Sequence, residues 1–178
     1  MKEQTFERNT IPKPSPGVGG PCLSKDPYIL QSSFKENNLN SNLILAARET
    51  NEKMIEHIAE RSEKLLYKIG KKIGKCKIFI SGFAFKGNPE TSDIRSSTTL
   101  LFLNYLKRKN IKNIWGHDFK IKKEELTKLK IKFCSIEQGF KDADAVFIMN
   151  NNLQYNEMNI FKLIGTMNKP ALFFDSWQ

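Results

Sequence analysis

After Gly74 the sequence alternates between short apolar runs and amphipathic segments, and this alternation constrains the fold more than any other feature. Apolar runs of this length are typical of strands, and the segments between them have helical spacing. Strands joined by helices predict a parallel sheet with helices on both faces. We expect the strands at 77–83, 113–117, 131–134, 145–149 and 171–175, and the helices at 96–109, 122–130, 136–142 and 160–167.

A second constraint comes from residues 41–70, where apolar side chains recur at spacings of three and four and predict one long helix. Asn40 or Ser41 can cap its start, and Gly70 and Gly74 mark its end. A helix of roughly 30 residues is long for a small domain, and such length is typical of a spine shared between domains or subunits.

We therefore expect an α/β protein in three parts. A loop and a short helix occupy residues 1–36, with the helix opening over 22–30, and a long central helix occupies 37–74. A small doubly wound, Rossmann-like domain with a parallel sheet occupies 75–178. Ligands in such domains bind at the carboxyl ends of the strands, which directs attention to the loop after the first strand.

Composition excludes several classes of protein. No apolar stretch approaches the roughly 18 residues that a transmembrane helix needs, and residues 1–14 lack the apolar core of a secretory signal. The chain is therefore expected to be cytoplasmic, with no membrane partner. The three cysteines, Cys22, Cys76 and Cys134, are widely spaced and form no CxxC pair, which predicts free thiols with neither a disulfide framework nor a metal site.

The formal net charge of +10 has two interpretations. One is nucleic-acid binding through a basic patch. The other is a solvated basic surface that also attracts anionic ligands such as nucleotide diphosphates. The lysines are spread over several segments rather than gathered in one, so we favour the second interpretation and expect no nucleic-acid partner.

Residues 16–27, PGVGGPCLSKDP, combine three glycines with a cysteine and an acid. Gly17, Gly19 and Gly20 lack side chains and would let a ligand approach the backbone closely. If Cys22 lies at a helix start, the helix dipole and Lys25 would favour its thiolate, with Asp26 one turn further on. That arrangement suits a covalent nucleophile beside a carboxylate that handles water; the alternative is a buried structural cysteine beside a turn.

Residues 82–97, GFAFKGNPETSDIRSS, follow the first predicted strand and form the second candidate segment. One of the two serines after Arg95 can cap the next helix, and a helix N-terminus beside Lys86 and Arg95 is a natural anion site. The alternative is a crossover loop in which Arg95 pairs with Asp93. At the end of the second strand, His117 with Asp118 forms either a ligand edge or, as we favour, a turn.

Together these segments resemble the UDP-glucose/GDP-mannose dehydrogenase family. GVGGPCLSKDPY at 17–28 is similar to the family's catalytic cysteine loop. GFAFK at 82–86, followed by DIRSS at 93–97, resembles its second signature. Residues 48–51 in the long helix and DADAV at 142–146 also fit, and the two main motifs occur in the right order and at the right separation.

The resemblance implies a four-electron oxidation in which C6 of a UDP-hexose or UDP-N-acetylhexosamine changes from alcohol to carboxylate while two NAD are reduced. It implies that Cys22 attacks the intermediate aldehyde, that a thioester forms, and that water hydrolyses it with help from Asp26. Arg95 would reach the NAD cofactor. The implied substrate-binding residues are Gly17, Gly19, Gly20, Phe85 and Lys86.

The resemblance also implies partners. The long helix would form a homodimer, and residues 75–178 would bind the UDP-sugar. No GxGxxG fingerprint of an amino-terminal NAD-binding domain occurs in the sequence. We therefore expect part of an enzyme that is inactive alone, with a separate amino-terminal Rossmann chain as a candidate partner. The alternative is a non-catalytic UDP-sugar-binding or oligomerisation module. An N-acetylhexosamine is the slightly favoured substrate.

Overall fold

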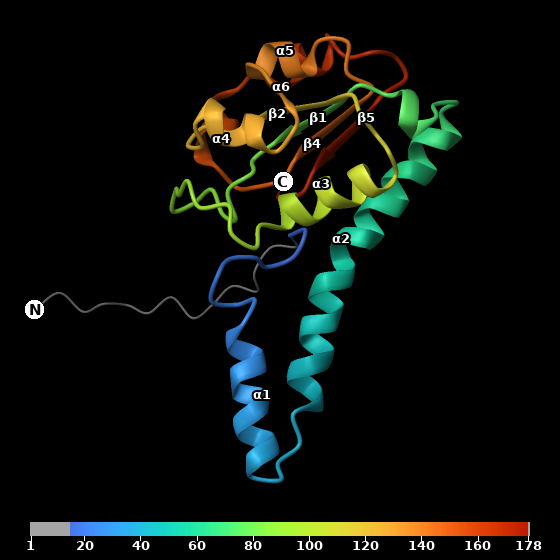
Figure 1. Cartoon of the computed structure of the whole chain (residues 1–178). Helices are drawn as coiled ribbons and strands as arrows, with labels where there is room; N and C mark the ends of the chain where they lie inside the picture. Colours follow the sequence, from blue (N-terminus) through green and yellow to red (C-terminus); the bar gives the residue numbers. More distant parts are fainter. Residues whose placement is uncertain (1–14, 178) are drawn as a thin grey trace, which may run out of the picture.

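The computed structural model describes residues 15–177, which form an α/β domain and a helical hairpin that extends away from it (Figure 1). The part of the predicted amino-terminal loop that precedes Ser15 lies outside the described residues. All strand pairs are parallel, in the spatial order β3-β2-β1-β4-β5. The strands are β1 (Ile78–Ser81), β2 (Ile114–His117), β3 (Lys132–Phe133), β4 (Ala145–Ile148) and β5 (Leu172–Asp175). The predicted parallel sheet is confirmed.

Helices cover both faces of this sheet, as predicted for a doubly wound domain. Successive side chains of a strand point to opposite faces. Ile78 and Ile80 of β1 therefore pack in the core beneath α2 and α3, whereas Phe79 packs in the second core with Phe140 and Val146. The domain helices are α3 (Thr98–Arg108), α4 (Lys123–Lys128), α5 (Ile136–Phe140) and α6 (Ile160–Ile164), with 3-10 turns η1 (Ile73–Lys75) and η2 (Leu153–Glu157).

All four domain helices end one to three residues earlier than the sequence suggested. α5 stops at Phe140 and α6 at Ile164. In α5 the reason is local, because Asp142 adopts a φ of 55°, a left-handed conformation that cannot continue a right-handed helix. The residues beyond both ends still contribute to the core, since Ala143 and Met167 are buried.

The predicted long helix is α2 (Asn42–Lys68), 27 residues that end before Gly70 at a φ of 78°. Its second half packs on the domain through buried Ile55, Ile58 and Leu66. Its first half runs beside α1 (Asp26–Glu36), which has no buried residue, and the two form the hairpin (Figure 1). Within the described residues, no helix combines the length and apolar character needed to cross a membrane.

The first short helix begins later than expected, at Asp26 instead of Cys22. Pro27 suits the first turn of α1 because the amide hydrogen it lacks would have had no partner inside the helix. Residues 21–25 form turns instead, in which the Cys22 carbonyl accepts hydrogen bonds from Lys25 N at 3.0 Å and Asp26 N at 2.9 Å. Cys22 therefore lies in a turn before the helix.

Candidate functional site

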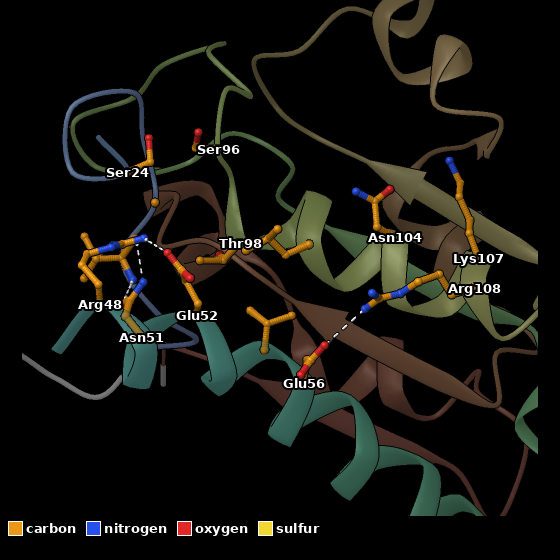
Figure 2. A pocket seen from close by; sticks show the side chains of 14 residues that line it. Ser24, Arg48, Asn51, Glu52, Glu56, Ser96, Thr98, Asn104, Lys107 and Arg108 are labelled. Carbon is orange, nitrogen blue, oxygen red and sulfur yellow. Dashed lines mark hydrogen bonds and ion pairs between the residues drawn. The ribbon is translucent and has the colours of Figure 1, made fainter. Parts of the chain in front are cut away.

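The cysteine loop, residues 15–25, is held against α2 by one side chain. Asn51 accepts a hydrogen bond from Val18 N at 2.7 Å and donates one to Val18 O at 3.0 Å, so its amide pairs with the loop backbone as a neighbouring strand would. Gly17, with a φ of 115°, lies over Asn51, where an added Cβ would be 3.2 Å from the Asn51 carbonyl oxygen. Figure 2 shows Asn51 rising from α2 toward this loop.

The other two glycines bring the cysteine loop against the loop that follows β1. Gly20 N donates to Ser96 O at 3.1 Å. A Cβ at Gly19 would lie 2.4 Å from the same oxygen, and one at Gly20 would lie 2.9 Å from the Phe85 ring. The missing side chains of Gly19 and Gly20 thus let the two loops pack closely together, and their contact with a sugar stays a prediction.

Cys22 is exposed, which excludes the alternative of a buried structural cysteine. The condition of a helix start beneath Cys22 is not met, because α1 begins four residues later. Asp26 forms an ion pair with Lys25 instead of standing free. The hydrogen bond and charge of Asp26, with a smaller contribution from the Cys22 thiolate, raise the pKa of Lys25 above its ordinary value.

We call residues 82–97 the lysine loop. Phe83 and Ala84 are buried, and Phe85 N donates to Asp93 O at 3.0 Å, which leads the chain into the exposed part of the loop. Lys86 Nζ lies 5.4 Å from the centre of the Phe85 ring, and this ring is the one that touches Gly20. The structure therefore brings the predicted residues Gly20, Phe85 and Lys86 together.

Arg95 pairs with Asp93, as the alternative interpretation of this segment expected. Its Nε donates to both carboxylate oxygens at 3.0 Å and its Nη2 donates to Oδ2 at 2.7 Å. This pairing lowers the pKa of Asp93 and raises that of Arg95, to which the charge of Cys22 adds a smaller effect. Arg95 thus lies within electrostatic reach of the cysteine. The cap of α3 is Ser97, which accepts from Thr99 N at 3.2 Å.

Two residues support the lysine loop: Asn151, which sequence reasoning missed, and Asp118, for which it expected only a turn or a ligand edge. Asp118 Oδ2 accepts from Phe83 N at 2.7 Å and from Ala84 N at 3.0 Å. Asn151 Oδ1 accepts from Gly87 N at 2.8 Å and from Asn88 N at 3.1 Å. Their signal in the sequence was their place shortly after β2 and β4, but this signal could be used only once the strand order put both strands beside β1.

Asp118 also settles the role of the segment after β2. Its other oxygen accepts from Lys120 N at 2.8 Å and Ile121 N at 3.1 Å, so the expected turn is confirmed. His117 Nδ1 lies 3.4 Å from Ser81 Oγ, and burial lowers its pKa. Across residues 15–177, no cluster of three His, Cys, Asp or Glu side chains could hold a metal ion.

A cavity of about 730 Å³ lies on the other side of the cysteine loop, between α2 and α3 (Figure 2). Arg48 lines it, bonded to Glu52 at 2.8 Å, with its Nε buried and lacking a hydrogen-bond partner among the described residues. Arg108 and Glu56 pair across it at 3.3 Å. Its lining includes Gly19 and Ser96, whereas Cys22, Phe85 and Lys86 lie outside it.

Comparisons with known proteins all point to one family. The family model described as UDP-glucose/GDP-mannose dehydrogenase family, UDP binding domain, matches residues 79–178, and the central-domain model of the same family matches residues 1–53. The UDP-N-acetyl-D-mannosamine dehydrogenase of Pyrococcus horikoshii is 31% identical over 171 residues, 96% of this chain and 37% of the relative. That of Methanococcus aeolicus is 28% identical and covers 94% of this chain and 36% of the relative.

Two solved structures that resemble this chain are also UDP-sugar dehydrogenases. The UDP-D-ManNAc dehydrogenase of Pyrococcus horikoshii superposes with a TM-score of 0.79 at 28% identity, covering 98% of this chain and 38% of that protein. A UDP-glucose dehydrogenase from Pyrobaculum islandicum superposes with a TM-score of 0.75 at 18% identity, which is a likeness of fold, and covers 92% and 35%. The chain thus spans little more than a third of the length of these proteins.

Proposed function

This chain belongs to the UDP-glucose/GDP-mannose dehydrogenase family, and from that premise we propose that it supplies the nucleophile and the UDP-sugar site of an NAD-dependent nucleotide-sugar 6-dehydrogenase. One observation carries the proposal. Gly20 of the cysteine loop lies against the Phe85 ring of the lysine loop, next to Lys86. A thiol and an ammonium thereby share the carboxyl edge of the sheet, where α/β domains bind ligands.

In this proposal Cys22 is the nucleophile. Its exposed thiol attacks the aldehyde carbon at C6 to form a thiohemiacetal, loss of hydride from that carbon gives a thioester, and water then cleaves the carbon–sulfur bond. The carboxylate leaves and the thiol is restored. Asp26, four residues on, orients the water after release from its ion pair with Lys25. Lys25 and Arg95 both lie within electrostatic reach of Cys22.

The substrate is held, in the same proposal, by residues of the two loops. Lys86 binds the diphosphate, because a compact ammonium on a flexible stem suits a phosphate oxygen. Phe85 packs on the apolar face of the ligand. Gly17, Gly19 and Gly20 line the sugar pocket in this proposal; the Gly20 amide already donates to Ser96 O, so Gly20 contributes through its other backbone atoms.

The described residues offer a partial fit for NAD. The guanidinium of Arg95 is exposed at the start of α3 and near Cys22, a position that suits a cofactor phosphate. NAD, when bound, accepts hydride from the sugar carbon. Arg95 would then release the Asp93 carboxylate and bind a phosphate oxygen of the cofactor instead, which would hold the cofactor near Cys22.

The names of the relatives favour an N-acetylated substrate, since both curated proteins described above are UDP-N-acetyl-D-mannosamine dehydrogenases. We therefore propose a UDP-N-acetylhexosamine. We also propose that α1 and α2 mediate a homodimer, because apolar side chains such as Leu39 and Leu43 are exposed on the hairpin.

Calorimetric titration of the chain with UDP, UDP-glucose and UDP-N-acetylmannosamine tests the proposal, with each mixture also assayed for NADH in the presence of NAD. We expect UDP to bind. Lys86→Ala should weaken the affinity for UDP by about tenfold, the loss typical of one charged hydrogen bond. Lys123→Ala, which removes an exposed lysine of α4, is the matched control. Failure of UDP to bind, or equal losses in both variants, contradicts the proposal. Binding without NADH supports the non-catalytic alternative for the chain alone.

A further inference from the structure

The lysine loop leaves the central strand between the ends of its two neighbours. Ser81, the last residue of β1, is in register with His117 of β2 and with Ile148 of β4. The residues that follow those two strands therefore flank the loop on both sides. Asp118 follows β2 directly, and Asn151 lies three residues beyond β4.

These two side chains hold the backbone on either side of the Phe85-Lys86 dipeptide. Asp118 receives the amide hydrogens of the two residues before it, at 2.7 and 3.0 Å. Asn151 receives those of the two residues after it, Gly87 at 2.8 Å and Asn88 at 3.1 Å. Each oxygen thus fixes two consecutive peptide groups, and the dipeptide between them has little freedom to shift.

The loop also lies directly on the backbone that carries Asn151. A Cβ at Gly87 would be 2.1 Å from Asn152 N and 2.6 Å from the carbonyl carbon of Asn151, so a side chain cannot fit there. Asn152 donates from Nδ2 to Glu90 at 3.2 Å, which ties the far end of the loop to the same segment. The lysine loop therefore packs directly on residues 150–152, the asparagine run that follows β4.

Lys86 itself contributes little to its own placement. Within residues 15–177 its Nζ makes no hydrogen bond or ion pair, and its recorded contact is the Phe85 ring at 5.4 Å. A long, flexible side chain with a free ammonium is oriented mainly by where its backbone stands. The contacts that fix the backbone of Lys86 therefore determine where its ammonium can reach.

We propose that Asn151 is a positioning residue of the UDP-sugar site: it acts on the ligand through Lys86, by fixing the peptide groups that follow it. This inference rests on the proposed function. An amide suits the task because its oxygen accepts both amide hydrogens without placing a negative charge beside an anionic ligand. Asp118, on the other side, is deeply buried and serves the turn after β2 as well, so it is the poorer position to test.

A double-mutant cycle with Asn151→Ala and Lys86→Ala, read by calorimetric titration with UDP, separates positioning from general damage. We expect Asn151→Ala alone to weaken UDP binding by roughly tenfold. In the Lys86→Ala background the same change should cost less than about twofold, because a residue that acts through Lys86 has nothing left to position. Equal losses in both backgrounds overturn the inference.

Two additions keep the outcome unambiguous. Asn156→Ala is the matched control, since Asn156 is an exposed asparagine of the same strand-end segment and forms no side-chain hydrogen bond among the described residues. Hydrogen exchange at the Gly87 and Asn88 amides gives a readout without ligand. It should accelerate about tenfold in Asn151→Ala and stay slow in Asn151→Asp, which retains an acceptor oxygen and also serves if the alanine variant does not fold.

The two readouts distinguish the proposals. If the unaltered chain binds no UDP, the proposed function fails and the assignment of Asn151 to a UDP-sugar site fails with it. If the chain binds UDP but exchange at Gly87 and Asn88 is unchanged in Asn151→Ala, the proposed function stands and only the inference about Asn151 is overturned.

Discussion

The two loops that make the candidate site are held in different ways. The lysine loop continues the central strand of the sheet, and its Phe83 and Ala84 are buried. Its backbone amides donate hydrogen bonds to Asp118 and Asn151, which follow the two neighbouring strands. The cysteine loop lies outside both hydrophobic cores, and its Leu23 is 51% exposed. Its polar attachments are chiefly those of Asn51 and of the Ser96 carbonyl, and Gly20 also packs on the Phe85 ring.

This difference separates two tasks. Lys86, which we propose binds the substrate, lies on the loop that continues the buried strand β1, and hydrogen bonds to Asp118 and Asn151 fix the backbone on either side of it. The proposed nucleophile stands on a segment fastened to α2 and to the surface of the lysine loop. We therefore expect the lysine side to be preformed and the cysteine side to adjust.

The largest effect is expected from Gly82→Ala compared with Gly19→Ala. Gly82 has a φ of 93°, and an added Cβ would lie 2.7 Å from the Asn150 side chain inside the domain. Strain and overlap there should lower the free energy of unfolding by about 2–4 kcal/mol. At Gly19 the overlap is with Ser96 O, and the peripheral loop can move away, so the loss should stay below about 1 kcal/mol. Urea denaturation measures both, and similar losses would remove the distinction between the loops.

Thiol labelling should distinguish the exposed cysteine from the two buried ones by their reactivity. Cys22 is exposed, Cys76 and Cys134 are buried, and burial raises the pKa of Cys134 to about 11. Because the thiolate is the reactive form, iodoacetamide at pH 8 should modify Cys22 alone in the folded chain and all three in urea. Mass spectrometry of peptides gives the answer. Native labelling of Cys134 would show that the domain is looser than this structure.

Asn51→Ala should release the cysteine loop while leaving the lysine loop in place. Two hydrogen bonds to Val18 are lost, and the free energy of unfolding should fall by about 1–2 kcal/mol. Limited proteolysis should cut within residues 15–25 faster than in the unaltered chain, with exchange at Gly87 unchanged. Thr50→Ala, at an exposed neighbouring position of α2, is the control. Faster exchange at Gly87 would mean that the two loops are coupled.

The smallest effect concerns pH. Glu90 of the lysine loop is bonded first to Lys120 and also to Gln154 and Asn152, and these contacts lower its pKa below 4.5. A depressed pKa stabilises the folded chain above the unfolded value, and this contribution is lost as pH falls through the folded value. Glu90→Gln should therefore lower the melting temperature slightly at pH 7, and this difference should shrink as the pH falls below 4.5. An unchanged difference at pH 3 would show that the carboxylate charge is irrelevant.

Much of the fold could be predicted from the sequence because it depends on local patterns of apolar and polar residues. An apolar run such as that of β4 predicts a strand covered on both faces. The spacing of apolar side chains in α2 predicts a long helix. Helix ends were less predictable, since α5 stops where Asp142 turns left-handed. Cys22 was placed at a helix start, but a run of turns precedes α1, and no periodic signal marks such turns.

For the site, the sequence by itself determined the chemical groups: a cysteine among glycines, and a lysine and an arginine in the segment after the first strand. Their arrangement was decided by the tertiary structure. Strand order set Asp118 and Asn151 on either side of Lys86, and the packing of Gly20 on Phe85 joined two segments far apart in the chain. The physical reason is that hydrogen bonds from side chain to distant backbone leave no periodicity in a sequence, whereas burial on a helix or strand does.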